Sequence, residues 1–382
     1  MRAGFIYDRV LAGISLGPLH PFKPDRARGC LELCRRYGLM DPGVVRELEP
    51  APASLETLSE FHTEEYLALL GEAARIAASE PPTMEMLTAG LGGGDNPIFP
   101  ELWELVTRST GATLDGLDAL LGGELERAFN PVGGFHHGFP DHAEGFCYSN
   151  DVVLAALRAR RAGRRVAVLD IDAHHGNGTQ AAFWQDDRVL AISLHQDGQT
   201  IYPHSGAATE VGEGPGEGFT VNVPLSPGAD DELFVQAFDR VVPRALDAFG
   251  PDLLIFEIGA DMHRDDPLTQ LRMTNRSFLW AASAISKRGG QILALGGGGY
   301  HPQRTVRAWT LAWAELSHQE PRDELAHAVG SGLYGVDAGT LLDPPDLHFD
   351  EDKETAREAL EGTLEALEDG LARLEAACAG RG

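Results

Sequence analysis

The chain has few lysines, few cysteines and no long apolar run. Only Lys23, Lys287 and Lys353 are lysines among its 31 basic residues, against 58 aspartates and glutamates, so the formal net charge is −27. Such a charge repels phosphate backbones, which argues against direct nucleic-acid binding and favours a basic, lysine-rich partner surface. The four cysteines lack the spacing of a disulfide framework, so we expect a reducing compartment and a cytoplasmic protein.

No segment is apolar over the length that a membrane span requires, so we expect no membrane contact. Residues 1–8 are expected to form a first strand rather than a signal peptide. The 382 residues, 43% of them hydrophobic, are enough for one large core.

Apolar runs alternate with amphipathic segments along most of the chain. The runs 128–132, 166–169, 189–192, 219–223, 253–258 and 291–295 are expected to be strands, and the segments 150–161, 231–249, 275–288 and 305–316 are expected to be helices. This alternation predicts an α/β fold, a three-layer sandwich whose central, mostly parallel sheet has helices on both faces. We expect one catalytic domain, 1–342, followed by an acidic helical extension, 343–382.

The extension carries apolar residues at alternating steps of three and four, namely Leu360, Leu364, Leu367, Leu371, Leu374 and Cys378. This is the spacing of a coiled-coil seam. The helix is short and contains Gly362 and Gly370, so it would be marginal alone in water. Its apolar stripe must therefore be covered, either by the chain's own body or by the partner subunit of a homodimer.

The run 166–169 ends in a burst of metal-ligand residues, Asp170-Ile171-Asp172-Ala173-His174-His175-Gly176-Asn177-Gly178. Residues at i and i+2 of a strand share a face, so Asp172 and His174 can reach one ion, with Asp170 behind them. A carboxylate and an imidazole suit zinc or a similar first-row ion, and an open coordination position would make the site catalytic. An ordinary polar turn after a buried strand is the alternative.

Three other apolar runs end in polar clusters. Asp261 follows the run 253–258, Gly296-Gly297-Gly298-Gly299-Tyr300 follows 291–295, and the His136-His137 pair follows 128–132. Ligands of parallel α/β sheets gather at the carboxyl ends of strands, so one shared site explains these clusters better than four coincidences. Asp261 is then the natural third metal ligand, the histidine pair the acid/base groups, and Tyr300 a hydroxyl donor.

Together these motifs resemble the zinc-dependent histone deacetylase family, especially its bacterial acetoin-utilisation branch. The matching segments are 17–26, His136-His137-Gly138, Gly145-Phe146-Cys147-Tyr148-Ser149-Asn150-Asp151, 170–178 and 296–300, within roughly the first 320 residues. The resemblance implies an arginase/deacetylase-type sandwich. It also implies hydrolysis of acetyl-lysine in proteins to lysine and acetate.

The resemblance implies one catalytic Zn²⁺ per chain, held by Asp172, His174 and Asp261. It makes His137 the general base with His136 assisting, while Asp170 holds the ring of His136. Tyr300 would donate a hydrogen bond to the developing oxyanion, an interaction whose loss typically lowers rates by about 10²–10³.

Asn177 stands where many class I members of the family carry an aspartate. An asparagine can still accept a hydrogen bond from an imidazole, but it brings no negative charge. We therefore expect His137 to be less basic than an aspartate partner would make it, with the reaction type unchanged.

The resemblance also implies how a substrate is gripped. Gly145, Phe146 and Tyr202 would form a narrow tube around an aliphatic linker, with Tyr202 in place of the family's usual phenylalanine. Asp95 matches a rim carboxylate that binds the substrate backbone, although a simple aspartate turn is the alternative. Leu268 stands where polyamine-selecting relatives place a glutamate, which favours acyl-lysine in proteins.

Arg26 matches a family arginine that lines an exit channel for acetate, and a plain surface arginine is the alternative. Two structural sites for K⁺ or Na⁺ are also implied. The first would be formed by Asp170, Asp172, His174, Ser193 and Leu194, and the second by Phe183, Asp186, Val189 and Phe219.

Other functions stay open at this point. Acetylpolyamines and longer acyl-lysines are alternative substrates within the family. An arginase-type ureohydrolase shares the architecture but needs a second metal bridged by extra aspartates, and a non-catalytic acyl-lysine binder would not need the complete set of catalytic residues. Kinship with acetoin-utilisation proteins implies an acyl-CoA synthetase as one acetylated protein substrate.

Overall fold

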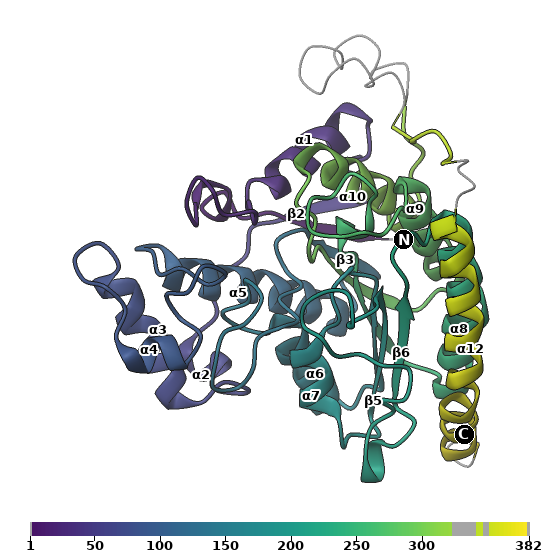
Figure 1. The fold of residues 1–382 in the computed structure, drawn as a ribbon. Coiled ribbons are helices and arrows are strands. Elements are labelled where there is room, and N and C mark those ends of the chain that lie inside the picture. Colours follow the sequence, from purple (N-terminus) through teal and green to yellow (C-terminus); the bar gives the residue numbers. More distant parts are fainter. Residues whose placement is uncertain (1, 323–340, 347–350, 380–382) are drawn as a thin grey trace.

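The computed structural model describes residues 2–322, 341–346 and 351–379. One eight-stranded sheet lies at its centre, with the order β2-β1-β3-β8-β7-β4-β5-β6 and parallel pairing throughout (Figure 1). The strands are β1 (Ala3–Ile6), β2 (Val45–Leu48), β3 (Arg127–Asn130), β4 (Val166–Asp170), β5 (Val189–Gln196), β6 (Thr220–Leu225), β7 (Leu253–Glu257) and β8 (Gln291–Leu295).

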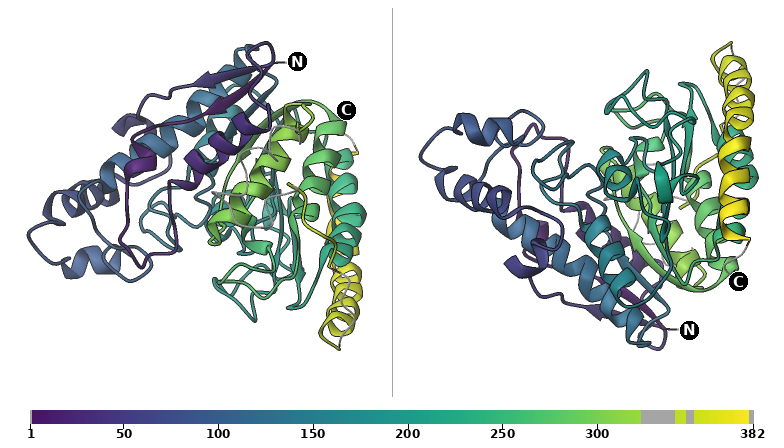
Figure 2. Two further views of the ribbon diagram at one scale, coloured as in Figure 1. Left: turned by 90° about the horizontal axis from the view of Figure 1, so that it is seen from above. Right: turned by 90° about the horizontal axis from the view of Figure 1, so that it is seen from below.

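Helices cover both faces of this sheet (Figures 1 and 2). One face carries α5 (Leu102–Leu121), α6 (Asp151–Arg161) and α7 (Asn177–Phe183). The other carries α1 (Arg26–Arg36), α8 (Asp231–Phe249), α9 (Asn275–Arg288), α10 (Pro302–Leu316) and α12 (Glu351–Cys378). The short helices α2 (Leu55–Leu58) and α4 (Met84–Thr88), with α3 (Glu64–Ile76), extend the first side, and 3-10 turns occur at Leu11–Gly13, Gly214–Gly216 and Ala260–Met262.

The buried side chains form two apolar clusters, one on each face of the sheet. On β4, Val166 and Val168 belong to the cluster under α5 and α6, whereas Ala167 and Leu169 belong to the cluster under α8. This period of two is the pattern of a strand buried on both sides, where both faces are apolar. The predicted three-layer α/β sandwich is thereby confirmed.

The four strands whose ends carry polar motifs are neighbours in the sheet, in the order β3-β8-β7-β4. Because all strands are parallel, their carboxyl ends open at one edge. The sheet order therefore brings the four motifs of the sequence to one place.

Helix boundaries follow from local capping chemistry. The predicted helices 231–249 and 275–288 have the bounds of α8 and α9, and Asp230 caps the first by accepting from Leu233 N at 3.2 Å. The helix predicted from 305 begins three residues earlier, at Pro302. A proline at the first helical position lacks only an N–H that would have no intrahelical partner.

Strand β5 runs to Gln196, beyond the predicted end at 192, because its polar end is buried and internally bonded. Ser193 Oγ lies 2.8 Å from His195 Nδ1, and His195 Nε2 lies 2.9 Å from the carbonyl oxygen of Gly206. Polar side chains can be buried when they are hydrogen-bonded. The prediction that the strand ends where polar residues begin was therefore wrong.

The last helix, α12, lies along α8 and packs on the edge strand β6 (Figure 1). Its stripe residues Leu364 and Leu371 are each 3% exposed and belong to the same apolar cluster as α8. The stripe is thus covered by the chain's own body, the first of the two alternatives; a homodimer through other surfaces stays a prediction. No helix within the described ranges combines the length and apolarity needed to cross a bilayer.

Replacing both Leu364 and Leu371 with glutamate places carboxylates in this apolar contact. Losing one buried leucine alone costs roughly 2–5 kcal/mol, so we expect the melting temperature to fall by more than about 5 °C. Light scattering should give an unchanged mass. The matched control is Ala366→Glu with Ala372→Glu, which adds the same charge on the exposed face of α12. A smaller mass of the leucine variant would contradict this expectation and identify a subunit interface.

Candidate functional site

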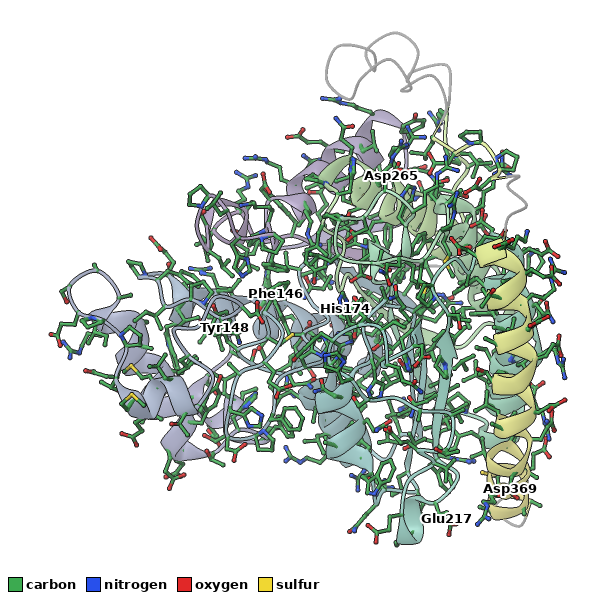
Figure 3. All side chains as sticks on the ribbon, viewed as in Figure 1. Phe146, Tyr148, His174, Glu217, Asp265 and Asp369 are labelled. Atoms are coloured by element: carbon green, nitrogen blue, oxygen red, sulfur yellow. The ribbon has the colours of Figure 1, made fainter. Side chains whose placement is uncertain are left out.

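Three metal-ligand side chains meet at the carboxyl ends of β4 and β7. The ligand atoms of Asp172, His174 and Asp261 lie within 4.8 Å of one another, and all three residues are buried. His174 Nδ1 lies 3.2 Å from Asp172 Oδ1 and 3.0 Å from Asp261 Oδ2. His174 is near the middle of the molecule in Figure 3.

The charges of this cluster fit a bound cation. Burial lowers the pKa of His174, but its hydrogen bonds to Asp172 and Asp261 and their charges outweigh burial and raise that pKa to about 10. Burial and the charge of Asp172 raise the pKa of Asp261 to about 7. The two buried carboxylates thus favour a positive charge at His174. A metal ion can supply the same charge, and a donor set of two oxygens and one nitrogen fits zinc.

The glycine run after β8 closes over these carboxylates. Gly298 N donates to Asp172 Oδ2 at 2.6 Å. A Cβ atom on Gly298 would lie 2.2 Å from Asp261 Oδ2, so no larger residue fits. The run therefore brings Tyr300 directly beside the cluster, and the ring centroid of Tyr300 lies 6.4 Å from that of His174.

The histidine pair lies next to the same cluster. His136 Nδ1 donates to Asp170 Oδ2 at 2.7 Å, as the resemblance implied, and His136 Nε2 lies 3.1 Å from His137 Nε2. Burial opposes the charged form of His136, but Asp170 and Asp172 outweigh burial and raise its pKa. Burial, and then the neighbouring charge of His136, holds the pKa of His137 well below its ordinary value. One histidine is thus suited to carry a proton and the other to accept one.

Asn177 is bonded on both sides. His137 Nδ1 donates to Asn177 Oδ1 at 2.8 Å, and Asn177 Nδ2 donates to Glu144 Oε2 at 2.9 Å. Glu144 was missed in the sequence, although it directly precedes Gly145 and Phe146 in the recognised motif. No local feature of the sequence indicates that this carboxylate reaches Asn177, 33 residues further along the chain.

The residues of the expected tube lie beside His137 and Tyr300. The ring centroids of Phe146 and Tyr300 are 5.6 Å apart, and those of Tyr202 and His137 are 5.1 Å apart. Gly145 and Phe146 have φ of 50° and 68°, and a Cβ on Gly145 would lie 2.4 Å from His137 Cδ2. Only glycine allows the backbone to pass so close to the imidazole. Phe146 is also central in Figure 3.

The expected rim residues are exposed. The side chain of Asp95 is in solvent, while its carbonyl oxygen lies 3.0 Å from His20 Nε2, and the ring of His20 packs on Phe146. Leu268 is 37% exposed. Asp266, which was not predicted, accepts from Leu268 N at 3.0 Å and from Tyr300 N at 2.6 Å, so it ties this rim loop to the tyrosine.

Arg26 is buried rather than a surface arginine, so that alternative is wrong. Its guanidinium lies between the rings of Phe22 and Trp309, 4.8 and 4.9 Å from their centroids. It donates to the carbonyl oxygens of Gly297, at 3.1 Å, and Gly299. Arg26 thus supports the glycine run from behind, and its part in an exit channel stays a prediction.

The expected cation-site residues also gather, but no contact tests the ions themselves. Asp170 and Ser193 are register partners on β4 and β5, next to Leu194, and Asp172 N donates to Asp170 Oδ1 at 2.9 Å. In the second set, Asp186 N donates to the carbonyl oxygen of Phe183 at 3.0 Å, shortly before Val189 begins β5, and the carbonyl oxygen of Phe219 accepts from Ala191 N at 2.9 Å. Both monovalent-cation sites stay predictions.

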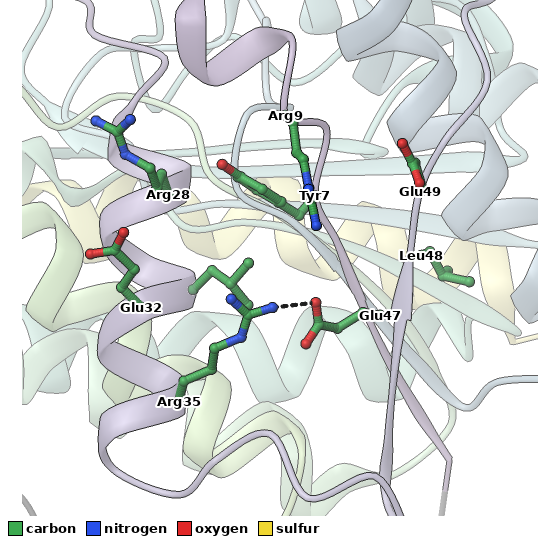
Figure 4. Close-up of a pocket in the computed structure, with 9 residues that line it drawn as sticks. Tyr7, Arg9, Arg28, Glu32, Arg35, Glu47, Leu48 and Glu49 are labelled. Atoms are coloured by element: carbon green, nitrogen blue, oxygen red, sulfur yellow. Dashed lines mark hydrogen bonds and ion pairs between the residues drawn. The ribbon is translucent and has the colours of Figure 1, made fainter.

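A separate hollow of about 330 Å³ lies between α1 and the β1–β2 edge (Figure 4). It is lined by Tyr7, Arg9, Arg28, Leu31, Glu32, Arg35, Glu47, Leu48 and Glu49, and Arg35 Nη2 lies 2.7 Å from Glu47 Oε2. Three arginines face three glutamates here. The mixed charges give no field of one sign that would select an ion.

Glu257, at the end of β7, lies beside the histidine pair and was also missed. It is fully buried; its Oε1 lies 3.1 Å from His136 Nδ1, but neither carboxyl oxygen has a well-formed hydrogen bond to the described residues. With His136 and Asp172 it forms a second group of close ligand atoms. Burial, followed by the charges of Asp170 and Asp172, raises the pKa of Glu257 well above its ordinary value of 4.5.

Because burial and the neighbouring carboxylates raise the pKa of Glu257 in the folded state, its ionisation disfavours folding, and the protein loses stability progressively as the pH rises above about 4.5. Glu257→Gln keeps the shape of the neutral acid. In metal-free protein the variant should melt several degrees higher than wild type at pH 8, with the difference shrinking towards pH 5. Thermal melts of both proteins between pH 5 and pH 8 test this expected difference, and Glu358→Gln, at an exposed glutamate, is the control. A variant less stable than wild type at pH 8 would contradict a neutral Glu257.

Comparison with known proteins agrees with this geometry. A family model described as the histone deacetylase domain matches residues 20–316. The chain is 31% identical over 360 residues to histone deacetylase B of Dictyostelium discoideum, covering 94% of this chain and 84% of that protein. It is 34% identical over 329 residues to the acetoin utilization protein AcuC of Bacillus subtilis, covering 84% of each.

Solved structures agree as well. A crystal structure of an HDAC homolog from Aquifex aeolicus superposes with a TM-score of 0.81 at 32% identity, covering 95% of this chain and all of the other, and the same values hold for an HDAC homolog complexed with SAHA. The predicted arginase/deacetylase-type fold is thereby confirmed. The chain belongs to the histone deacetylase family, whose members are zinc-dependent deacetylase hydrolases.

Proposed function

We propose that the protein hydrolyses acetyl-lysine in proteins to lysine and acetate. The observation that carries the proposal is the convergence of three elements at one buried point, namely the Asp172–His174–Asp261 cluster, the His136–His137 pair and Tyr300. The rings of His137 and Tyr300 lie 6.2 and 6.4 Å from that of His174. An amide carbonyl at the end of the tube would thus meet a metal site, a base and a hydroxyl donor together.

Each residue has one task in this proposal. Zinc held by the cluster, when bound, supplies a Lewis acid that polarises the amide carbonyl and activates water. His137 takes the proton of the attacking water, and a proton from the histidine pair leaves with the lysine amine as the C–N bond breaks. Tyr300 donates to the carbonyl oxygen as negative charge develops there. Asp170 holds the ring of His136 through Nδ1.

Leu268 favours a protein substrate over an acetylpolyamine. An exposed leucine at the rim offers no negative charge to a distant ammonium group. Exposed Asp95 is available to accept hydrogen bonds from a peptide backbone. Acetylpolyamines and longer acyl-lysines remain the alternatives, whereas a ureohydrolase is disfavoured by the family match over residues 20–316.

We infer that the physiological partner is an acetylated protein with a lysine-rich surface, because the chain's net charge of −27 attracts such a surface and repels nucleic acid. The 34% identity to AcuC favours an acyl-CoA synthetase as that partner. A cytoplasmic location is also part of the proposal, because the four cysteines lack the spacing of a disulfide framework.

An acetyl-lysine peptide with a fluorogenic leaving group tests the reaction. Activity should disappear with a chelator and return with Zn²⁺. Tyr300→Phe should lower kcat by about 10²-fold or more with little change in substrate binding, because its hydrogen bond strengthens only in the transition state. Tyr7→Phe, in the hollow beside β1, is the control. A Tyr300→Phe enzyme within about threefold of wild type would remove this hydroxyl from the mechanism, and tight binding without turnover would favour the non-catalytic reader.

Leu268→Glu tests the substrate class. The new carboxylate should attract the remote ammonium of acetylspermidine and repel the backbone carbonyls of a peptide, so the ratio of kcat/KM for the two substrates should shift about tenfold or more towards the polyamine. Leu55→Glu makes the same change at an exposed leucine of α2 and should leave the ratio alone. If wild type already prefers acetylspermidine to every peptide, the protein substrate is wrong.

A further inference from the structure

Glu144 is fixed by a tight turn at the wall of the tube. Its N–H donates to the carbonyl oxygen of Cys147 at 3.2 Å, and Cys147 N donates back to the carbonyl oxygen of Glu144 at 2.7 Å. The residues between them, Gly145 and Phe146, both have positive φ, and Phe146 N is held by Asn96 Oδ1 at 2.8 Å. The turn therefore sets the direction in which the Glu144 side chain leaves the backbone.

The carboxylate of Glu144 collects donors from two other segments. Its Oε2 accepts from Asn177 Nδ2 and from the Tyr202 hydroxyl, each at 2.9 Å, and its Oε1 lies 3.5 Å from His142 Nε2. An ionised carboxylate can only accept hydrogen bonds. The amide of Asn177 must therefore turn its nitrogen towards Glu144, which leaves its oxygen facing His137.

This orientation determines which nitrogen of His137 carries the proton. Asn177 Oδ1 lies 2.8 Å from His137 Nδ1 and can only accept, so Nδ1 is protonated. In neutral His137 the other nitrogen, Nε2, is then bare and faces His136 Nε2 at 3.1 Å. An amide turned the other way would donate to Nδ1 and put the proton on Nε2. The two ends of an asparagine amide are similar in size, so packing alone selects weakly between them.

We propose that Glu144 is a positioning residue that orients the Asn177 amide and so selects the tautomer of His137 whose Nε2 carries no proton and can accept one. The Tyr202 hydroxyl assists by donating to the same oxygen of Glu144. The proposal rests on the function proposed above, in which His137 is the base. An aspartate at the position of Asn177 would accept directly from His137 Nδ1 and keep the proton there. Glu144 has the same effect indirectly, through the amide of Asn177.

The tautomer can be measured without any substrate. In zinc-loaded enzyme labelled with ¹⁵N-histidine, the signals of His137 are identified by their loss in His137→Phe. Wild type should show a bare Nε2. Glu144→Lys replaces the acceptor with a donor, so the amide should reverse and the bare nitrogen should become Nδ1. The side chain of Glu144 is 35% exposed, which leaves room for this change.

Kinetics give a second, independent readout. Glu144→Ala should lower kcat about tenfold, the usual worth of one hydrogen bond, with a smaller change in KM. Glu144→Gln keeps an acceptor oxygen and should lose less. In an Asn177→Asp background no amide remains to be oriented, so Glu144→Ala should cost nothing or raise kcat by relieving repulsion between two carboxylates. Asp141→Asn removes the same charge from the same loop at a residue bonded to His142, and is the control.

Two results would overturn the proposal. One is an unchanged His137 tautomer in Glu144→Lys. The other is an equal loss of kcat on Glu144→Ala in the wild-type and Asn177→Asp backgrounds. Should the enzyme hydrolyse no acetyl-lysine substrate at all, the proposed function would fail, while the tautomer measurement would still decide the part that Glu144 plays.

Discussion

The buried pair of carboxylates Asp172 and Asp261 is the constraint around which the rest of the structure is arranged. Two negative charges beneath a protein surface are costly unless fixed dipoles and a cation surround them. Backbone N–H groups stabilise part of this negative charge, since Gly298 N donates to Asp172 and Ala173 N donates to Asp261 Oδ1 at 2.8 Å. The carboxylates and their donors come from the ends of three different strands, which is why the site exists only when the sheet is assembled, and why His174 or a metal ion must complete the charge.

The neighbouring histidine pair is ordered by the same charges. Asp170 and Asp172 favour a protonated His136, and a protonated His136 in turn favours a neutral His137. Hydrogen bonds then run without a break from Asp170 through His136, His137 and Asn177 to Glu144. A carboxylate therefore stands at each end of the chain of donors and acceptors, and the two imidazoles between them need not be equivalent. Two histidines can act as the acid and the base of one reaction only when their pKa values differ in this way.

Much of this arrangement could be predicted from the sequence because its signals are local. A buried strand shows its apolar run, and the polar residues that follow it mark a strand end, so Asp170, Asp172 and His174 could be identified together. Glu144, Asp266 and Glu257 could not, because each acts on a residue at least 33 positions away, as Glu144 does on Asn177. A glutamate before a glycine has no local signature of such a bond. Arg26 was ambiguous for a related reason, since only the folded chain places Phe22 and Trp309 on either side of its guanidinium.

The final helix is joined to the rest of the protein by a buried ion pair and by an apolar contact. Lys353 is one of three lysines, and it is 5% exposed, with Nζ 2.6 Å from Asp230 Oδ2 and 2.9 Å from Glu232 Oε2. Asp230 also caps α8 through Leu233 N, so one buried ion pair joins the start of α12 to the start of α8. An ion pair of this kind gives register more than stability, because desolvation offsets much of its attraction. The stability comes from the leucines of α12 against α8 and β6, and the outcome is that the edge strand β6 is covered by the chain itself.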